Sequence, residues 1–365
     1  MPCLTRQRIE RGTRRGKGGG FWLKVLIVKL SSLGDVVHTM AAVQDIVRAY
    51  PRAQIDWVVE RSFAPLVRRC SGVNRVIECE LRHWRNSPLS GRTRHAWRAF
   101  RAELRQEHYD AVIDLQGLSK SALVSWLALT TPAGRRYAMA NQTDGSAYEA
   151  PTRWVADVAI PLPPRIHAVA RGRELCACAL AYAVPKTRCF GLLAQVGQAQ
   201  GASNKIADEA AAGGPVALVH GTSRADKQWP LAHWQALGQR LLAHGYAVVL
   251  PHGSDAEQHE AQAIASGLAN ATVWPRLGLD ALTDALARCA GVVGVDSGLS
   301  HIAVALDLPH VQIYNFDTAW RTGPDELAPQ STHPARQRSV FARPTPSVDA
   351  VWQAWLAVAG NATLP

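Results

Sequence analysis

The feature that most constrains the fold is an alternation of short apolar strands and helices that starts near the N-terminus. Residues 24–29 (KVLIVK) are rich in β-branched residues and predict a buried strand. The small-residue loop 31–35 (SSLGD) interrupts it, and apolar residues then recur at helical spacing over 36–47, before Pro51. A strand, a short loop and a helix in this order open a parallel sheet.

The same alternation continues along the chain and then restarts. The first set predicts strands near residues 54–60, 74–79, 110–114 and 154–160, and helices near 62–70, 91–107, 118–129 and 167–183. A second set predicts strands near 216–220, 246–251, 271–274, 291–295 and 310–314, and helices near 231–244, 255–268, 279–289 and 298–306. Residues 347–359 place apolar side chains at helical spacing and predict a last amphipathic helix.

The length of 365 residues suits two α/β domains. We therefore expect two Rossmann-like, doubly wound parallel sheets whose strand ends surround a central cleft, where such sheets bind ligands. Residues 184–214 are poor in strand formers and rich in Gly, Ala, Gln and Ser, which predicts a linker. The other expected divisions are a basic leader (1–22), an N-terminal domain (23–183), a C-terminal domain (215–345) and a terminal helix (346–365).

The net charge of +11 is concentrated in two segments. Residues 1–20 carry six basic side chains against one glutamate, and residues 61–105 carry eleven arginines against three glutamates. Such a surface suits an anionic partner, namely nucleic acid, an anionic membrane face or an acidic substrate. A solvated arginine-rich face is the alternative. The glycine-rich leader has the composition of a flexible tail. Translation from an upstream start codon is another explanation for this segment.

Cysteine usage and hydropathy bear on the compartment and the chemistry. The seven cysteines form an odd set without CxxC or zinc-ligand spacing, which favours a reducing cytoplasm over a disulfide framework or a zinc site. No apolar run approaches the ~20 residues that span a bilayer. The chain also lacks an Asp-x-Asp pair, a GxSxG elbow and an HExxH helix, which argues against metal-chelating transferases, serine hydrolases and zinc proteases.

The loop of residues 29–35 is the first candidate site. It lies between a strand and a helix N-terminus, where backbone N–H groups and the helix dipole favour an anion. Its Asp35 either caps the helix or takes a proton from a hydroxyl group.

Two later loops have the same strand–loop–helix setting. In residues 219–230, Thr222, Ser223 and Lys227 offer hydroxyl donors and a mobile charge that suit phosphate oxygens, with a solvated polar turn as the alternative. In residues 292–307, a strand is expected to end at Asp296. A tight turn and a helix start follow, with backbone donors that suit a diphosphate.

These loops together resemble glycosyltransferase family 9, the bacterial lipopolysaccharide heptosyltransferases. The resemblance runs from Lys24 to the C-terminus, and RHWR at 82–85 favours the type I branch over the type II branch. Its carriers are KVLIVKLSSLGDVVHT (24–39), IDWVVE (55–60), RVIECELRHWR (75–85), YDAVIDLQGLSKSA (109–122), HGTSRADKQWP (220–230) and VDSGLSHIAVALDLP (295–309).

The resemblance implies a GT-B fold whose C-terminal helix returns toward the N-terminal domain. It implies inverting, metal-independent transfer of heptose from ADP-L-glycero-β-D-manno-heptose to the inner-core Kdo of Kdo-lipid A, without a cofactor. The enzyme would then be cytoplasmic, with peripheral contact at the cytoplasmic face of the inner membrane, and would not bind nucleic acid.

The resemblance also implies a role for each candidate residue. Asp35 matches the general base, and Ser32, Arg82 and Arg85 match positions that hold the acceptor. The donor positions are Thr222, Ser223, Lys227, Glu257, Leu277, Asp296, Ser297, Gly298 and His301. In residues 141–153 no arginine stands at the place that matches the family's acceptor arginine after the fifth strand, so Arg135 and Arg153 are its candidate replacements.

Three other functions compete with this one. The nearest is a type II heptosyltransferase with another acceptor. A catalytically silent binder of nucleotide sugars or anionic lipids is disfavoured by Asp35 in the SSLGD loop. A nucleic-acid binder would use the arginine-rich face, but the chain lacks a recognised motif and spaced aromatic platforms for it.

Overall fold

The computed structural model describes residues 22–195, 214–324 and 336–360. The chain forms two compact units, residues 1–192 and 193–365. The leader and most of the expected linker lie outside the described residues. Residues 190–192 belong to unit 1, because Leu192 forms a β-bridge with Cys70 and the Gly191 carbonyl accepts from the Ser71 N–H.

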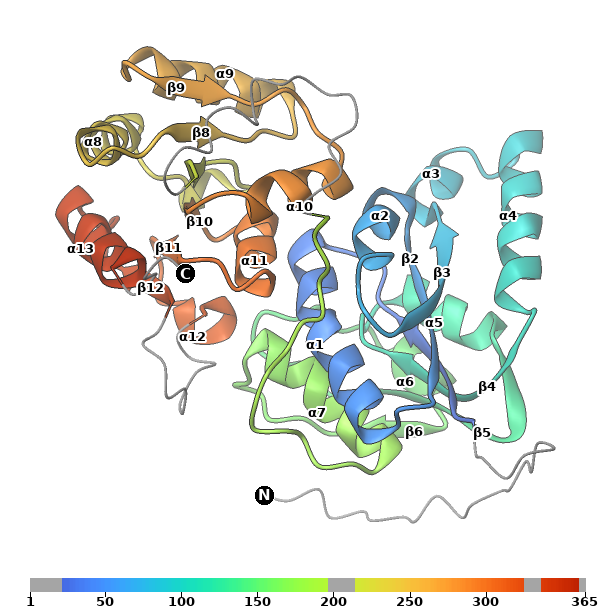
Figure 1. Ribbon diagram of the computed structural model, residues 1–365. Coiled ribbons are helices and arrows are strands. Elements are labelled where there is room, and N and C mark those ends of the chain that lie inside the picture. The colour runs from blue at the N-terminus through green and yellow to red at the C-terminus, as the bar shows by residue number, and fades with distance from the viewer. Residues whose placement is uncertain (1–21, 196–213, 325–335, 361–365) are drawn as a thin grey trace. The chain divides into compact units, whose positions relative to one another are not determined.

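Unit 1 contains a six-stranded parallel sheet in the order β3-β2-β1-β4-β5-β6 (Figure 1). Helices α1 and α7 pack side by side, whereas α3, α4 and α5 contribute to one apolar cluster with β1, β3 and β4. Its elements are β1 Lys24–Val28, α1 Leu33–Ala49, β2 Gln54–Glu60, η1 Arg61–Phe63, α2 Ala64–Val67, β3 Val73–Cys79, α3 Leu81–Asn86, α4 Gly91–Leu104, β4 His108–Asp114, α5 Ser119–Leu127, β5 Leu129–Met139, α6 Pro151–Val155, β6 Val158–Ile160 and α7 Ala168–Leu180.

Unit 2 repeats the architecture with the sheet order β12-β11-β10-β7-β8-β9 (Figure 1). Its core joins apolar strand residues to Trp234 of α8 and Trp355 of α13, so the terminal helix is part of this unit. Its elements are β7 Val216–Val219, η2 Ala225–Lys227, α8 Leu231–Ala243, β8 Val248–Leu250, α9 Asp255–Ser266, β9 Ala271–Val273, α10 Leu279–Ala287, β10 Gly291–Val295, α11 Gly298–Ala305, β11 His310–Tyr314, α12 Ala319–Thr322, β12 Gln337–Phe341 and α13 Val348–Ala359.

The prediction of two doubly wound parallel sheets is confirmed, with two kinds of error in detail. The expected strand over 154–160 is wrong in its first half, because Pro151 starts helix α6 and only 158–160 pair with β5. The sequence pattern also missed α3, β5, η2, α12 and β12. Within the described residues, no helix is long and apolar enough to cross a membrane.

Candidate active site

Asp35 lies in the first turn of α1, directly after β1 and its loop. Its Oδ2 accepts hydrogen bonds from the Ser32 backbone N–H at 3.3 Å and from the Ser32 hydroxyl at 3.2 Å. These bonds satisfy donors at the helix start, so the capping role is present. The Oδ1 atom faces a different set of groups.

Two buried cations approach Asp35 Oδ1. Lys29 Nζ lies 3.5 Å away, and Arg171 Nη2 of α7 lies 3.7 Å away. Burial opposes ionisation of Asp35, but the charges of Lys29, Arg171 and His38 outweigh it and hold its pKa well below the usual range. The carboxylate is therefore ionised at neutral pH. It lines a small cavity together with Lys29, His38, Thr39, Leu115, Met139, Ala168, Arg171, Gly172 and Leu175.

Both cations are anchored by further bonds. Lys29 Nζ donates to the Leu115 carbonyl at 3.0 Å, and Arg171 Nη1 donates to Thr143 Oγ1 at 3.2 Å. Helix α7 is in turn fixed to α1 by a buried two-pronged ion pair, in which Arg173 donates to both oxygens of Asp45 at 2.6 and 3.0 Å. The position of the cations beside Asp35 thus follows from the packing of the unit.

The neighbouring loop after β4 holds the Asp35 loop in place. The Leu30 and Ser31 backbone N–H groups both donate to Gln116 Oε1 at 3.0 Å. Lys120 Nζ at the start of α5 donates to Ser31 Oγ at 3.3 Å. Because β1 and β4 are adjacent and parallel, their following loops meet at one edge of the sheet.

The predicted acceptor arginines lie on different elements of unit 1. Arg82 and Arg85 lie exposed on α3, just beyond the carboxyl end of β3. Arg135 pairs in register with Ala111, ahead of the last residues of β4 and β5, and is exposed away from that edge. Arg153 lies exposed on α6. The arginine that the structure brings to Asp35 is Arg171, which the sequence analysis missed.

In unit 2, Asp296 at the end of β10 joins both predicted donor loops. Its Oδ2 accepts from Lys227 Nζ at 2.6 Å, and its Oδ1 lies 3.4 Å from His301 Nε2. Gln312 and Thr322 also donate to Oδ1, at 3.3 and 3.4 Å. Burial opposes ionisation, but the contacts with His301 and Lys227 dominate and hold the pKa of Asp296 below its usual range.

Two hydroxyl groups near this network are candidates for ligand binding. Thr222 Oγ1, after β7, and Ser297 Oγ, at the start of α11, are buried without a hydrogen-bond partner in the described part of the chain. Strands β7 and β10 are adjacent and parallel, so both hydroxyls lie at the same sheet edge. Buried donors without partners cost free energy, which a bound ligand would recover.

The remaining donor candidates surround these loops less closely. Glu257 of α9 accepts a hydrogen bond from the Gly253 N–H at 2.6 Å. The Glu257 side chain also packs closely on Gly221, since a Cβ there would lie 2.7 Å from Glu257 Cδ. Ser223 is exposed, Gly298 starts α11 and Leu277 is half-buried in the loop before α10. The described residues contain no group of three His, Cys, Asp or Glu side chains that could hold a metal ion.

Comparison with known proteins decides the family. Residues 97–338 match glycosyltransferase family 9 (heptosyltransferase). The chain belongs to this family. It is therefore a glycosyltransferase, and its two sheets form the GT-B fold that the resemblance implied.

Individual relatives narrow the similarity. Lipopolysaccharide heptosyltransferase 1 of Pseudomonas aeruginosa is 38% identical over 292 residues, which cover 80% of this chain and 78% of the relative. Lipopolysaccharide heptosyltransferase 2 of Escherichia coli is 28% identical over 330 residues, which cover 86% and 87%. The structure of Escherichia coli heptosyltransferase WaaC with ADP matches with a TM-score of 0.78 at 32% identity, over 93% of this chain and 100% of that one.

Proposed function

We propose that this enzyme transfers heptose from ADP-heptose to the inner-core Kdo of Kdo-lipid A, in lipopolysaccharide core synthesis. The higher identity to heptosyltransferase 1 than to heptosyltransferase 2 supports this acceptor over the alternative. The observation that carries the proposed chemistry is Asp35, an ionised carboxylate in the first turn of α1 with two buried cations beside it.

The proposed reaction is a single inverting displacement. The Kdo hydroxyl oxygen attacks the anomeric carbon of heptose, and the bond from that carbon to the ADP oxygen breaks. The hydroxyl proton goes to Asp35, and ADP leaves with the electron pair. Because Lys29 and Arg171 hold Asp35 ionised, it accepts the proton as the new bond forms, when the hydroxyl becomes acidic.

In unit 2, the proposed donor site balances the charge of the diphosphate with its own groups, without a cation from solution. Lys227 supplies the charge, the start of α11 supplies backbone N–H groups, and Thr222 and Ser297 supply hydroxyl donors. We assign Glu257 and Leu277 to the nucleoside side of this site and His301 to the heptose side, as the family resemblance suggests.

The acceptor is expected to be held by cations of unit 1. Arg82, Arg85 and Ser32 are its proposed contacts, and guanidinium groups suit the Kdo carboxylates and lipid A phosphates. We infer that Arg171, rather than Arg135 or Arg153, fills the role of the missing acceptor arginine. Its guanidinium is beside the proposed base, whereas Arg135 is remote from that edge of the sheet.

The test is a transfer assay with purified protein, ADP-heptose and Kdo-lipid A. We expect release of ADP and a mass gain of one heptose, both unaffected by EDTA. An acceptor that already carries one heptose should not react, and preference for it would indicate the type II reaction. Binding of ADP-heptose without transfer would indicate a silent binding protein. We also propose that the enzyme makes peripheral contact with the inner membrane.

A further inference from the structure

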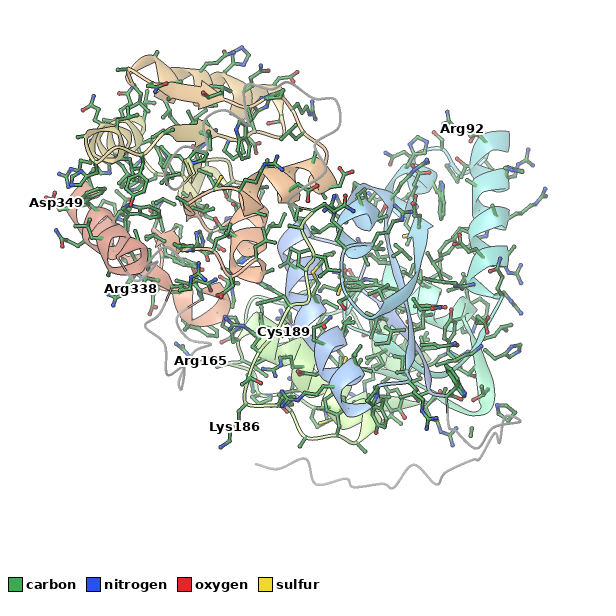
Figure 2. The ribbon with its side chains drawn as sticks, in the orientation of Figure 1. Arg92, Arg165, Lys186, Cys189, Arg338 and Asp349 are labelled. Carbon is green, nitrogen blue, oxygen red and sulfur yellow. The ribbon has the colours of Figure 1, made fainter. Side chains whose placement is uncertain are left out.

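Helix α4 carries a stripe of arginines without acidic partners. Arg94, Arg98, Arg101 and Arg105 recur at intervals of four, three and four residues, so they share one side of the helix. All four are exposed, and none forms an ion pair or a side-chain hydrogen bond within the described residues. Arg92, which is labelled in Figure 2, marks the start of this helix.

The one acidic residue of α4 lies on the opposite flank. Arg75 of β3 donates to the Glu103 carbonyl at 3.3 Å, and Arg75 is also the main charge near the Glu103 carboxylate. Glu103 therefore marks the flank of α4 that faces β3, which is the edge strand of the sheet. The arginine stripe is on the other flank of α4, on the side toward α5. Helices α4 and α5 share one apolar cluster, so they cover the same face of the sheet.

Helices α5 and α6 expose large apolar side chains on this face. Leu123 and Trp126 of α5 are 40% and 63% exposed, and Trp154 of α6, which packs against α5, is 78% exposed. Exposed apolar side chains that are gathered on neighbouring helices mark interaction or membrane-binding surfaces. We define the basic–aromatic face as Arg94, Arg98, Arg101, Arg105, Leu123, Trp126 and Trp154.

We propose that the basic–aromatic face is the surface by which the enzyme docks on an anionic lipid bilayer. This inference rests on the proposed function, whose acceptor is embedded in a membrane by its lipid. Arginines are attracted to anionic headgroups, and tryptophan rings prefer the headgroup level of a bilayer. The combination fits a bilayer better than a second copy of the chain, because two such faces would repel each other. Duplex DNA would engage the arginines through its phosphates and leave the two tryptophans unused.

The test is co-sedimentation of the full chain with lipid vesicles free of acceptor. We expect binding to mixed phosphatidylcholine–phosphatidylglycerol vesicles and little binding to phosphatidylcholine alone. Since each arginine near the surface contributes roughly a fivefold increase in affinity, the triple variant Arg94→Glu, Arg98→Glu, Arg101→Glu should bind at least about 100-fold more weakly. The double variant Trp126→Gln, Trp154→Gln should lose the binding that persists at high salt.

A charge-matched control separates the face from overall charge. The triple variant Arg52→Glu, Lys186→Glu, Arg338→Glu changes the same total charge at exposed positions on other elements. It should keep vesicle affinity within about fivefold of the native protein, the contribution expected of a single arginine near the surface. Equal loss in both triple variants would overturn the proposal. So would duplex DNA binding that outcompetes vesicles and ignores the tryptophans, or a dimer that only the α4 variant abolishes.

Turnover on detergent-dispersed acceptor distinguishes the two proposals. The α4 variant should keep native turnover there, because its substituted residues are outside the proposed donor and acceptor contacts. Loss of that turnover together with vesicle binding would assign the arginines to the acceptor site and refute the docking surface. If the native protein binds vesicles through this face but transfers no heptose, the proposed function fails and the docking surface stands.

Discussion

At the scale of single residues, the two roles considered for Asp35, helix cap and proposed general base, are compatible. Its Oδ2 caps α1 through Ser32, while its Oδ1 faces Lys29 and Arg171. One carboxylate can do both because its two oxygens point to different partners. Capping therefore fixes the orientation of the oxygen that is proposed to take the proton.

Replacement of Asp35 by asparagine tests this division. Asparagine keeps an oxygen for the cap but loses the charge, so the fold should be retained while turnover falls about 10²–10⁴-fold. ADP affinity, measured by calorimetry, should stay at the native value, because the donor candidates all lie in unit 2. Near-native ADP release in the transfer assay would show that Asp35 only caps the helix.

Replacement of Arg171 by methionine should move the pH profile. In the native protein Arg171 and Lys29 depress the pKa of Asp35, so the base form persists below the usual aspartate range. Loss of one cation raises that pKa, and the acid limb of kcat/KM should shift upward by about one pH unit. An unchanged limb with intact circular dichroism would show that Arg171 does not act on Asp35.

At the scale of elements, the sequence predicted the strand ends better than the strands themselves. Asp296 directly follows β10, and Asp35 and Thr222 come a few residues after β1 and β7. Adjacent parallel strands bring such positions to the carboxyl edge of their own sheet. Arg171 was not predictable in this way, because its place beside Asp35 depends on how α7 packs against α1. Gln312 was the visible signal that was overlooked, since it is a polar residue inside the buried strand β11.

Strand β5 was missed for a physical reason. It contains Pro132 and Gly134, and its register with β4 shifts between Tyr109 and Ala111. Proline is tolerated in a sheet at such irregularities, so the pattern of an apolar run is absent although the strand is internal. The edge strand β12 is similarly polar and only partly buried.

The irregularity makes Gly134 a sensitive position. A Cβ there would lie 2.4 Å from the Tyr109 carbonyl oxygen, and that backbone atom cannot move aside easily. Gly134→Ala should therefore lower the free energy of unfolding by roughly 1–3 kcal/mol, seen as a lower Tm. Gly91→Ala is the control, since no atom lies within 4 Å of its Cβ. Equal Tm values for the two variants would mean that β5 can adjust.

At the scale of the whole molecule, the donor candidates all belong to one compact unit with its own core. A fragment of residues 193–365 should therefore fold alone and bind ADP within about tenfold of native affinity, the factor that corresponds to 1.4 kcal/mol. Calorimetry and thermal unfolding measure this, with Lys227→Ala in the fragment as the non-binding control. A folded fragment without ADP affinity would place part of the donor site in unit 1.

The ion pair between Lys227 and Asp296 also has a kinetic consequence. Before the diphosphate binds, the Lys227 ammonium group is paired with the Asp296 carboxylate. In the proposed reaction the ammonium group exchanges this carboxylate for the diphosphate. When ADP departs, Lys227 returns to the carboxylate and not to an unpaired state. In the proposed reaction, the resident carboxylate thus competes with the leaving group, which should shorten the residence time of ADP and limit product inhibition.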